Sequence, residues 1–243
     1  MTTLAKYNNQ SVEPKLGQIW GTTLGGAGVT HAKPDTLLPF IKQARAELKE
    51  ADPVVLAVRS GAQHKRLDKE RGELRLTLWG QGYLVIYPDF IAYEEESGEL
   101  CSSWRQGLFL HYLRTADGKP LADRWVSLRE IEGGGFYHRA FQGYSGDRVA
   151  KHFGNDIEAF GRAAKRAGGE RRQLGDAAYS FLALPRVPLV VVYWQGDEEF
   201  SPTAQVLFDA SAGHYLPVDG LAILGRELCG RIIRAASGGR EED

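Results

Sequence analysis

The chain has 243 residues, a length that suits one large domain or two small ones. Hydrophobic residues make up 43% and charged residues 25%, which are ordinary values for a soluble globular protein. The formal net charge of −1 gives no electrostatic footprint for nucleic acid, and the longest strongly apolar run, residues 187–194, is too short to span a bilayer. We therefore expect neither a nucleic acid nor a membrane as a partner.

Cysteine usage limits the redox chemistry. The two cysteines, Cys101 and Cys229, are far apart and form no C-x-x-C arrangement. A cluster held by four thiolates is therefore excluded for this chain alone, so we expect no self-contained iron–sulfur cluster. A disulfide framework is also disfavoured, which indicates a reducing compartment. The N-terminus has no apolar segment of the kind that a secretory signal needs, so we expect a cytoplasmic location.

The first part of the chain predicts an arm, a helix and a meander. Residues 1–35 are polar and contain a glycine-rich stretch without phosphate-loop spacing, which favours a flexible or docking arm. A start signal at Pro34 and apolar residues at helical spacing predict a helix through Leu48. The alternating charges of residues 65–71 indicate a solvated loop or edge. Turn signals separate four β-like runs that we expect to pair antiparallel, at 54–58, 73–79, 83–87 and 90–93.

The rest of the chain mixes helices and strands. A helix is predicted from about Glu99 to Thr115, with a stripe of Leu100, Trp104, Leu108 and Tyr112. A strand at 125–131 follows, and then two helices capped by Ser145 and Asn155. Three more strands are predicted at 177–184, 187–194 and 204–208. A last helix begins near Pro217 and carries a stripe of Leu221, Leu224, Leu228 and Ile232.

This order of elements lacks regular β-α-β alternation, which predicts the α+β class. We expect a single domain over residues 36–236, built on a largely antiparallel mixed sheet flanked by helices. The end of the chain, residues 237–243, is too polar to fold and is expected to be a disordered tail.

Three segments carry a resemblance to a known family. They are GLFLHYLRTADGKPLADRWVSLREIEGGGFYHRAF at 107–141, FGNDIEAFGRAAKRAGG at 153–169 and the stretch from Gly175 to Pro217, which includes WQGDEEF. The order and spacing of L-H-Y-L, a Trp-led strand ending in glycines, L-P-x-x-P and W-x-G-D-E-E-F are specific. Over roughly residues 40–235 the chain resembles the uncharacterised bacterial and archaeal family called domain of unknown function 3786.

The resemblance implies a context rather than an activity. Some members resemble fusions to a cysteine-rich iron–sulfur domain of the type found in corrinoid proteins of anaerobic methyl transfer. Because this chain lacks such cysteines, the resemblance implies a role beside a protein partner that carries the cluster or the corrinoid. The first hypothesis is therefore a non-catalytic binding or accessory protein in anaerobic metabolism. A further hypothesis is that the chain is a scaffold subunit of a larger complex.

An acidic cluster follows the strand that ends in Trp194. Carboxylates are ligands for hard divalent cations, and the cluster comprises Asp197, Glu198, Glu199 and Asp209. The second hypothesis is accordingly a divalent-metal-assisted enzyme that uses these acids. The alternative is a charged turn in which Asp197 bonds its own backbone and the glutamates face water. Because Glu198 and Glu199 leave the turn on opposite faces, we expect one of them to point with Trp194 toward a cleft.

Histidines supply the candidate ligands for a flat cofactor. No two of the six lie at i, i+4 on one helix, so H-x-x-x-H zinc geometry is absent. His111, beside Tyr112 on a helix, fits a core position or an axial ligand of a corrinoid or other tetrapyrrole. His138 follows a glycine run, where the backbone can approach a flat ligand closely. The candidate cofactor-binding residues are therefore His111, Tyr112, His138 and Trp194.

Overall fold

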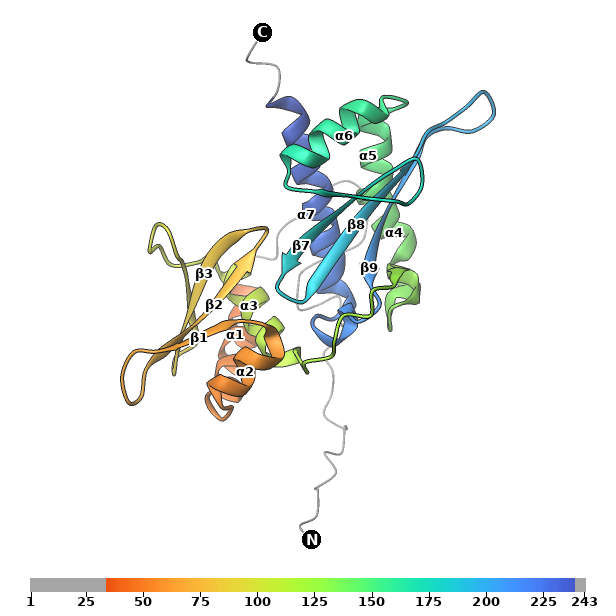
Figure 1. Ribbon diagram of the computed structural model, residues 1–243. Helices are drawn as coiled ribbons and strands as arrows, with labels where there is room; N and C mark the ends of the chain where they lie inside the picture. The colour runs from red at the N-terminus through yellow and green to blue at the C-terminus, as the bar shows by residue number, and fades with distance from the viewer. Residues whose placement is uncertain (1–33, 239–243) are drawn as a thin grey trace.

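The computed structural model describes residues 34–238. The predicted arm and tail fall almost entirely on residues 1–33 and 239–243, which lie outside the described residues. Figure 1 shows two sheets, each with its own helices: the first belongs to the N-terminal half and the second to the C-terminal half. The described chain is α+β, as predicted, but its strands divide between two antiparallel sheets instead of one mixed sheet.

The first sheet is a four-stranded meander in the order β1-β2-β3-β4. Its strands are β1 (Gln63–Arg66), β2 (Gly72–Leu78), β3 (Gln81–Tyr87) and β4 (Ile91–Glu94). Burial alternates strictly along β2, as expected for a sheet with one face on the core. Three helices accompany this sheet, namely α1 (Pro34–Lys49), α2 (Pro53–Ser60) and α3 (Ser103–Thr115). Helix α3 packs its Phe109 ring 4.8 Å from that of Tyr83 in β3.

The strand predicted at 54–58 was wrong, because these residues lie in helix α2. The Asp52 side chain accepts a hydrogen bond from the Val54 amide, Pro53 occupies the first turn, and Gly61 ends the helix with a left-handed φ of 73°. These start and stop signals outweigh the strand preference of the valines, because a capped first turn satisfies amides that would otherwise lack partners. The second half of the edge strand β1, residues 65–66, falls within the charged stretch that was expected to be a solvated loop or edge.

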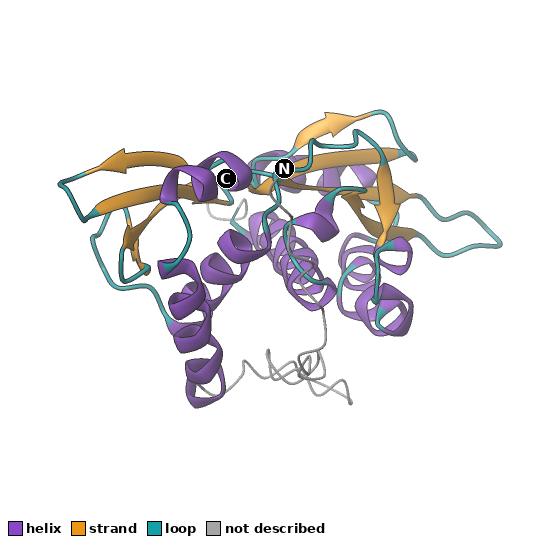
Figure 2. Cartoon of the chain, turned by 90° about the horizontal axis from the view of Figure 1, so that it is seen from below, coloured by secondary structure: helices purple, strands orange, loops and turns teal. Residues whose placement is uncertain are grey.

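The second sheet is five-stranded, in the order β5-β9-β8-β7-β6. Its strands are β5 (Trp125–Ser127), β6 (Glu170–Arg172), β7 (Ala177–Leu184), β8 (Val187–Trp194) and β9 (Thr203–Asp209). The helices of this half are α4 (His138–Tyr144), α5 (Gly146–Phe153), α6 (Ile157–Arg166) and α7 (Val218–Ser237). Short 3₁₀ turns are η2 (Leu128–Glu130), η3 (Gly134–Phe136) and η4 (Ala212–His214). Figure 2 shows both sheets along one side of the molecule, with most of the helices on the other.

Two element boundaries and two helix caps in this part of the chain differ from the predictions. Helix α3 starts at Ser103 instead of Glu99, so Leu100 lies outside the helix and is exposed. Strand β5 ends at Ser127, and the chain then turns into η2. Asp156, and not Asn155, caps α6, because its side chain accepts from the Ala159 amide. Ser145 precedes α5, but its hydroxyl donates to the Phe141 carbonyl and makes no cap bond.

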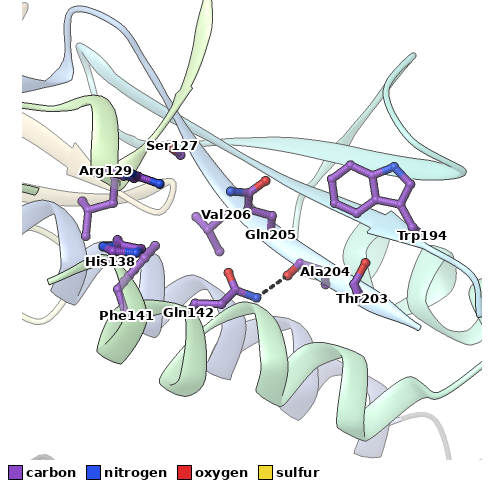
Figure 3. A pocket seen from close by; sticks show the side chains of 11 residues that line it. Ser127, Arg129, His138, Phe141, Gln142, Trp194, Thr203, Ala204, Gln205 and Val206 are labelled. Atoms are coloured by element: carbon purple, nitrogen blue, oxygen red, sulfur yellow. Dashed lines mark hydrogen bonds between the residues drawn. The ribbon is translucent and has the colours of Figure 1, made fainter. Parts of the chain in front are cut away.

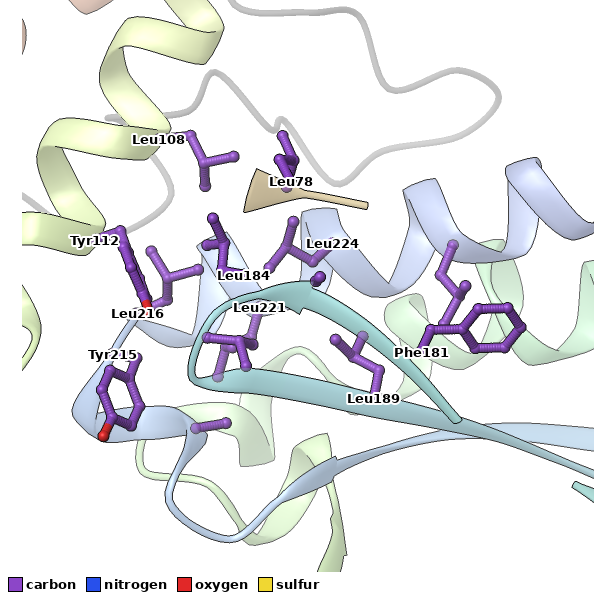
Figure 4. Close-up of a cluster of buried hydrophobic side chains, with 14 of the residues drawn as sticks. Leu78, Leu108, Tyr112, Phe181, Leu184, Leu189, Tyr215, Leu216, Leu221 and Leu224 are labelled. Carbon is purple, nitrogen blue, oxygen red and sulfur yellow. The ribbon is translucent and has the colours of Figure 1, made fainter. Parts of the chain in front are cut away.

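One continuous hydrophobic core joins the two halves. Figure 4 shows side chains from β2, α3, β7 and α7 meeting around Leu184, and the predicted stripe of α7 is fully buried there. The backbone amide of Trp79, at the β2–β3 turn, donates to the Ala183 carbonyl on β7 at 2.9 Å. The Tyr112 hydroxyl donates to the Ser60 carbonyl and accepts from the Arg186 amide. These contacts hold the first sheet against the second.

Within residues 34–238, no helix is both long enough and apolar enough to cross a membrane.

Candidate functional site

A groove of about 410 Å³ runs along β9 beside α4 (Figure 3). Its floor is apolar, and polar side chains stand around it. The lining residues come from β5 and η2 (Ser127, Leu128, Arg129), from α4 (His138, Phe141, Gln142), from the end of β8 (Trp194) and from β9 (Thr203, Ala204, Gln205, Val206). An apolar cavity with a few polar groups is the usual form of a small-ligand site, and the volume lies within the common range of roughly 300–1,000 Å³.

The groove exists because β5 is short. Ser127, opposite Leu207, is the last β5 residue that pairs with β9. Residues 203–206 of β9 therefore present a strand edge with no neighbouring strand among the described residues. Side chains alternate between the faces of a strand, so four consecutive lining residues indicate that the groove follows the edge itself.

Helices α4 and α5 partly cover this edge. Gln142 donates to the Ala204 carbonyl at 2.9 Å and to Asp147 at 2.7 Å. Gly146 approaches the same carbonyl so closely that an added Cβ would lie 2.0 Å from the Ala204 oxygen. A further strand cannot pair along the whole edge without moving these helices. The groove therefore suits a compact ligand better than an added β-strand.

His138 lies at the start of α4, directly after η3. Its Nδ1 atom is 2.8 Å from the Gly135 carbonyl oxygen. A carbonyl can only accept, so Nδ1 carries the hydrogen and donates it. In the neutral ring, Nε2 is then the basic nitrogen. This arrangement fixes the tautomer and the orientation of the ring, as carbonyl partners do for ligand-binding histidines.

The two ends of the groove differ in chemistry. Figure 3 shows Arg129 beside His138 at one end and the Trp194 indole at the other. Trp194 is 37% exposed, so much of its ring is available for contact. Gln205 projects between the ends. The groove thus offers positive charge at one end, a flat aromatic surface at the other, and amide groups between them.

The other two predicted cofactor residues lie elsewhere. His111 is buried in α3 and packs against Phe40, with ring centroids 5.1 Å apart. Burial, aided by the positive charge of Arg114, lowers the pKa of His111 to about 3, which keeps the ring neutral. The Tyr112 hydroxyl both donates and accepts within the core. In this structure His111 belongs to the packing of α3 on α1 and Tyr112 to the contact between the halves, and neither lines the groove.

The acids after Trp194 form a projecting turn. The Asp197 carboxylate accepts from the amides of Glu199 and Phe200 at 2.9 and 2.8 Å, and these bonds lower its pKa. Asn155 fixes the base of the turn by accepting from the Gly196 amide. Glu198 and Glu199 are exposed, and neither lines the groove. The expected pairing of one glutamate with Trp194 in a cleft is therefore not found.

Asp209 is separated from the other acids by the length of β9. It is buried, and its carboxylate accepts from the Ala122 amide and from the amide and hydroxyl of Ser211. The proposed acidic ligands thus lie at opposite ends of one strand. Across residues 34–238, no group of three or more histidine, cysteine or acidic side chains is placed to hold a metal ion.

Both cysteines are buried free thiols. Burial raises the pKa of Cys101 to about 11 and that of Cys229 to about 12, so neither is an activated thiolate at neutral pH.

The structure brings together two of the four predicted cofactor residues, His138 and Trp194. The sequence did not indicate Arg129, Gln142 or Gln205. Arg129 fell within a predicted strand, and only the early end of β5 brings it to the groove.

The chain was compared with models of known protein families. The model described as "Domain of unknown function (DUF3786)" matches residues 52–231, well over half of the chain. No curated protein and no solved structure matches the chain.

Proposed function

The chain belongs to the DUF3786 family, and on that premise we propose that it is a binding protein whose groove holds an organic anion with a flat, apolar part. The observation that carries the proposal is the convergence of Arg129, His138 and Trp194 on one apolar floor. Arg129 lies in the 3₁₀ turn η2 and His138 is the first residue of α4, whereas Trp194 ends a strand of the second sheet. A paired strand holds Trp194, and the bond to the Gly135 carbonyl fixes the His138 ring, so the site is largely preformed.

The division of labour follows from the chemistry of each group. The Arg129 guanidinium forms paired hydrogen bonds with a carboxylate or phosphate. The Nε2 atom of His138 either accepts a hydrogen bond or, when protonated, adds a second positive charge. Trp194 stacks on a flat ring, and Phe141 and Val206 supply the apolar floor. Gln205 and Gln142 then orient polar atoms between the ends.

The groove supports the accessory hypothesis more than the enzymatic one. The acids proposed for metal-assisted catalysis do not converge, whereas a ligand groove is present. A partner with a corrinoid or an iron–sulfur cluster stays a prediction from the family resemblance. If the ligand were a tetrapyrrole, His138 with its oriented Nε2 atom would be the residue to hold its metal, rather than the buried His111.

A pair of flavins tests the proposal. FMN carries a flat ring and a phosphate, and riboflavin carries the same ring without the phosphate. We expect FMN to quench Trp194 fluorescence and raise the melting temperature, and riboflavin to bind roughly 10- to 160-fold more weakly, since one charge-assisted contact contributes roughly 1.5–3 kcal/mol. Cobalamin and haem, followed by their absorption spectra, extend the panel to tetrapyrroles.

Variants locate the binding. Arg129→Ala should remove the preference for FMN over riboflavin, and Trp194→Ala should weaken both flavins. Arg139→Ala is the matched control, because Arg139 is exposed on α4 but does not line the groove. Absence of binding by FMN, cobalamin and haem, or binding that both groove variants leave unchanged, contradicts the proposal.

A further inference from the structure

A second cavity, of about 650 Å³, lies at the junction of the two halves, away from the groove. The β2–β3 turn supplies Thr77, Trp79 and Gly80, and the segment before β5 supplies Leu121 and Asp123. The second sheet contributes Trp125, Asp209 and residues of β6, β7 and β8. We refer to it as the junction cavity.

The outer face of the second sheet places an aromatic ring next to a buried acid. Trp125 of β5 and Asp209 of β9 are direct cross-strand partners. Side chains in such a pair project from the same face with Cβ atoms roughly 4.5–5.5 Å apart. Both residues line the junction cavity. The register of β5 against β9 therefore builds an indole–carboxylate pair there.

Asp209 is an ionised group at a buried position, where a charge is energetically unfavourable. Burial disfavours its charged form, but hydrogen bonds from the Ser211 hydroxyl and the Ala122 amide outweigh that effect and lower its pKa. Only 2% of the residue is exposed. None of the ion pairs among the described residues includes Asp209. The carboxylate therefore stays negative at neutral pH beside a cavity.

The other charges around the cavity do not cancel this one. Arg172 donates to Glu170 at 2.9 Å and to the Ser180 hydroxyl at 2.7 Å, so its charge is matched within β6. Asp123 adds a second carboxylate, which is exposed. The lining thus carries an excess of negative charge together with two tryptophans.

Backbone strain is concentrated at the same place. Of the three non-glycine residues with positive φ in residues 34–238, two line the cavity: Trp79 with φ 53° and Asp123 with φ 51°. A bulky aromatic residue rarely adopts this conformation, and such strain persists only where the surroundings impose it. The bond from the Trp79 amide to Ala183 is one such constraint.

From this geometry we propose that the junction cavity binds an organic ammonium ion, with its cationic head between the Trp125 ring and the carboxylates of Asp209 and Asp123. An indole face attracts such cations, and carboxylates supply the counter-charge. A divalent metal is the poorer fit, because Ca²⁺ takes six to eight oxygen ligands and no group of three or more histidine, cysteine or acidic side chains within residues 34–238 is placed to hold a metal ion.

Choline and its uncharged isostere 3,3-dimethylbutan-1-ol test the proposal by NMR, with the indole N–H signals of the tryptophans as reporters. We expect choline to shift the Trp125 signal and the alcohol to bind about tenfold more weakly, since a desolvated cation–π contact contributes up to roughly 2 kcal/mol. Trp125→Leu should abolish the choline-induced shift of the Trp79 signal, which remains as a reporter in that variant, and Asp123→Asn should weaken choline binding severalfold. Trp194→Leu, in the groove, is the matched control and should leave choline binding unchanged.

Asp209→Asn tests the buried acid, with circular dichroism to confirm that the variant folds. If it unfolds, Asp123→Asn and Trp125→Leu still decide the question. Equal binding of choline and the alcohol, no shift of the Trp125 signal with choline, or a larger shift with Mg²⁺ or Ca²⁺ than with choline overturns the proposal. Since Trp125 and Trp194 report separately, failure here is distinct from failure of flavin binding in the groove.

Discussion

The two sheets differ in what lies on their outer faces. In β2 and β3 buried residues alternate with half-buried or exposed ones, so one face packs on the core and the other meets water. In β7 and β8 almost every residue is buried. The second sheet packs against the main core on one face, and Ala178, Val190 and Val192 form a separate apolar cluster on the other.

This difference locates the candidate sites. Both the groove and the junction cavity are built largely from the second sheet, one along the β9 edge and one on the outer face. The first sheet contributes only the β2–β3 turn to the junction cavity. The first half thus supports and partly encloses the second, and the second carries most of the groups that can recognise a ligand. The following predictions test this division.

The largest expected effect is in the helical layer of the second half. Leu224 of α7 is fully buried, and Leu224→Ala should lower the free energy of unfolding by about 2–5 kcal/mol, because it removes packing and leaves a cavity. Chemical denaturation measures the loss. Arg234→Ala on the same helix is the exposed control. A loss within the error of the denaturation curve would show that α7 does not pack as described.

The start of α7 should make the second half sensitive to pH. Burial raises the pKa of Asp219 from 3.8 to about 6. The protonated form is thus favoured in the fold, so the contribution of Asp219 to stability is largest below pH 3.8 and falls as the pH rises toward 6. The difference is on the order of 3 kcal/mol. Asp219→Asn should therefore stabilise the protein at pH 8 and change little near pH 3.5, as measured by denaturation at both values.

The contact between the two halves at Tyr112 should contribute less to the free energy of unfolding than the two features above. Tyr112→Phe removes a hydroxyl that bonds Ser60 and Arg186 and leaves two backbone groups without that partner, which should cost roughly 1–3 kcal/mol. Tyr83→Phe, whose hydroxyl donates to a neighbouring glutamine within the first sheet, is the matched control. Equal losses of unfolding free energy in the two variants would argue against a special role for the contact between the halves.

A pair of outer-face variants measures the difference between the sheets directly. Val190→Ala, in the second apolar cluster, should cost about 1–3 kcal/mol, because the residue is fully buried. Ile86→Ala, on the half-exposed face of β3, removes more atoms but should cost less than about 1 kcal/mol. The reverse order would mean that the outer face of the second sheet is not an apolar layer.

The smallest effects are expected at the acidic turn. Asp197→Ala removes two hydrogen bonds that shape the turn, so it should lower the melting temperature more than the double variant Glu198→Gln, Glu199→Gln. Neither change should alter flavin binding, because none of these residues lines the groove. Weaker FMN binding by the double variant would extend the ligand site to the turn.

Local signals were sufficient for some elements and not for others. Alternation predicted β2, and the helical stripe predicted α7, because in each the burial pattern repeats along many residues. Helix α2 was missed because its valines resemble a strand, although Asp52, Pro53 and Gly61 mark both of its ends. Giving these capping residues more weight than the valine content would have identified the helix.

The candidate sites depend on pairings that no local pattern encodes. His138 and Trp194 were predicted singly, but their meeting depends on α4 lying beside β9. The Trp125–Asp209 pair requires the strand order β5-β9-β8 and its register. Asp209 was grouped with acids close in sequence, whereas the strand between them carries it to the opposite end of the sheet. Proximity in sequence was the wrong guide for that residue.

The contact between Trp79 and Ala183 has a consequence for handling the protein in pieces. Strand β6 pairs with only part of β7, and the β2–β3 turn occupies the remaining edge at Ala183. A fragment that begins after α3 would expose this edge, and exposed strand edges promote aggregation. The two fragments should therefore aggregate when they are expressed separately and reassemble when they are co-expressed. The segment between α3 and β5 is accordingly a suitable position at which to divide the chain for a split reporter.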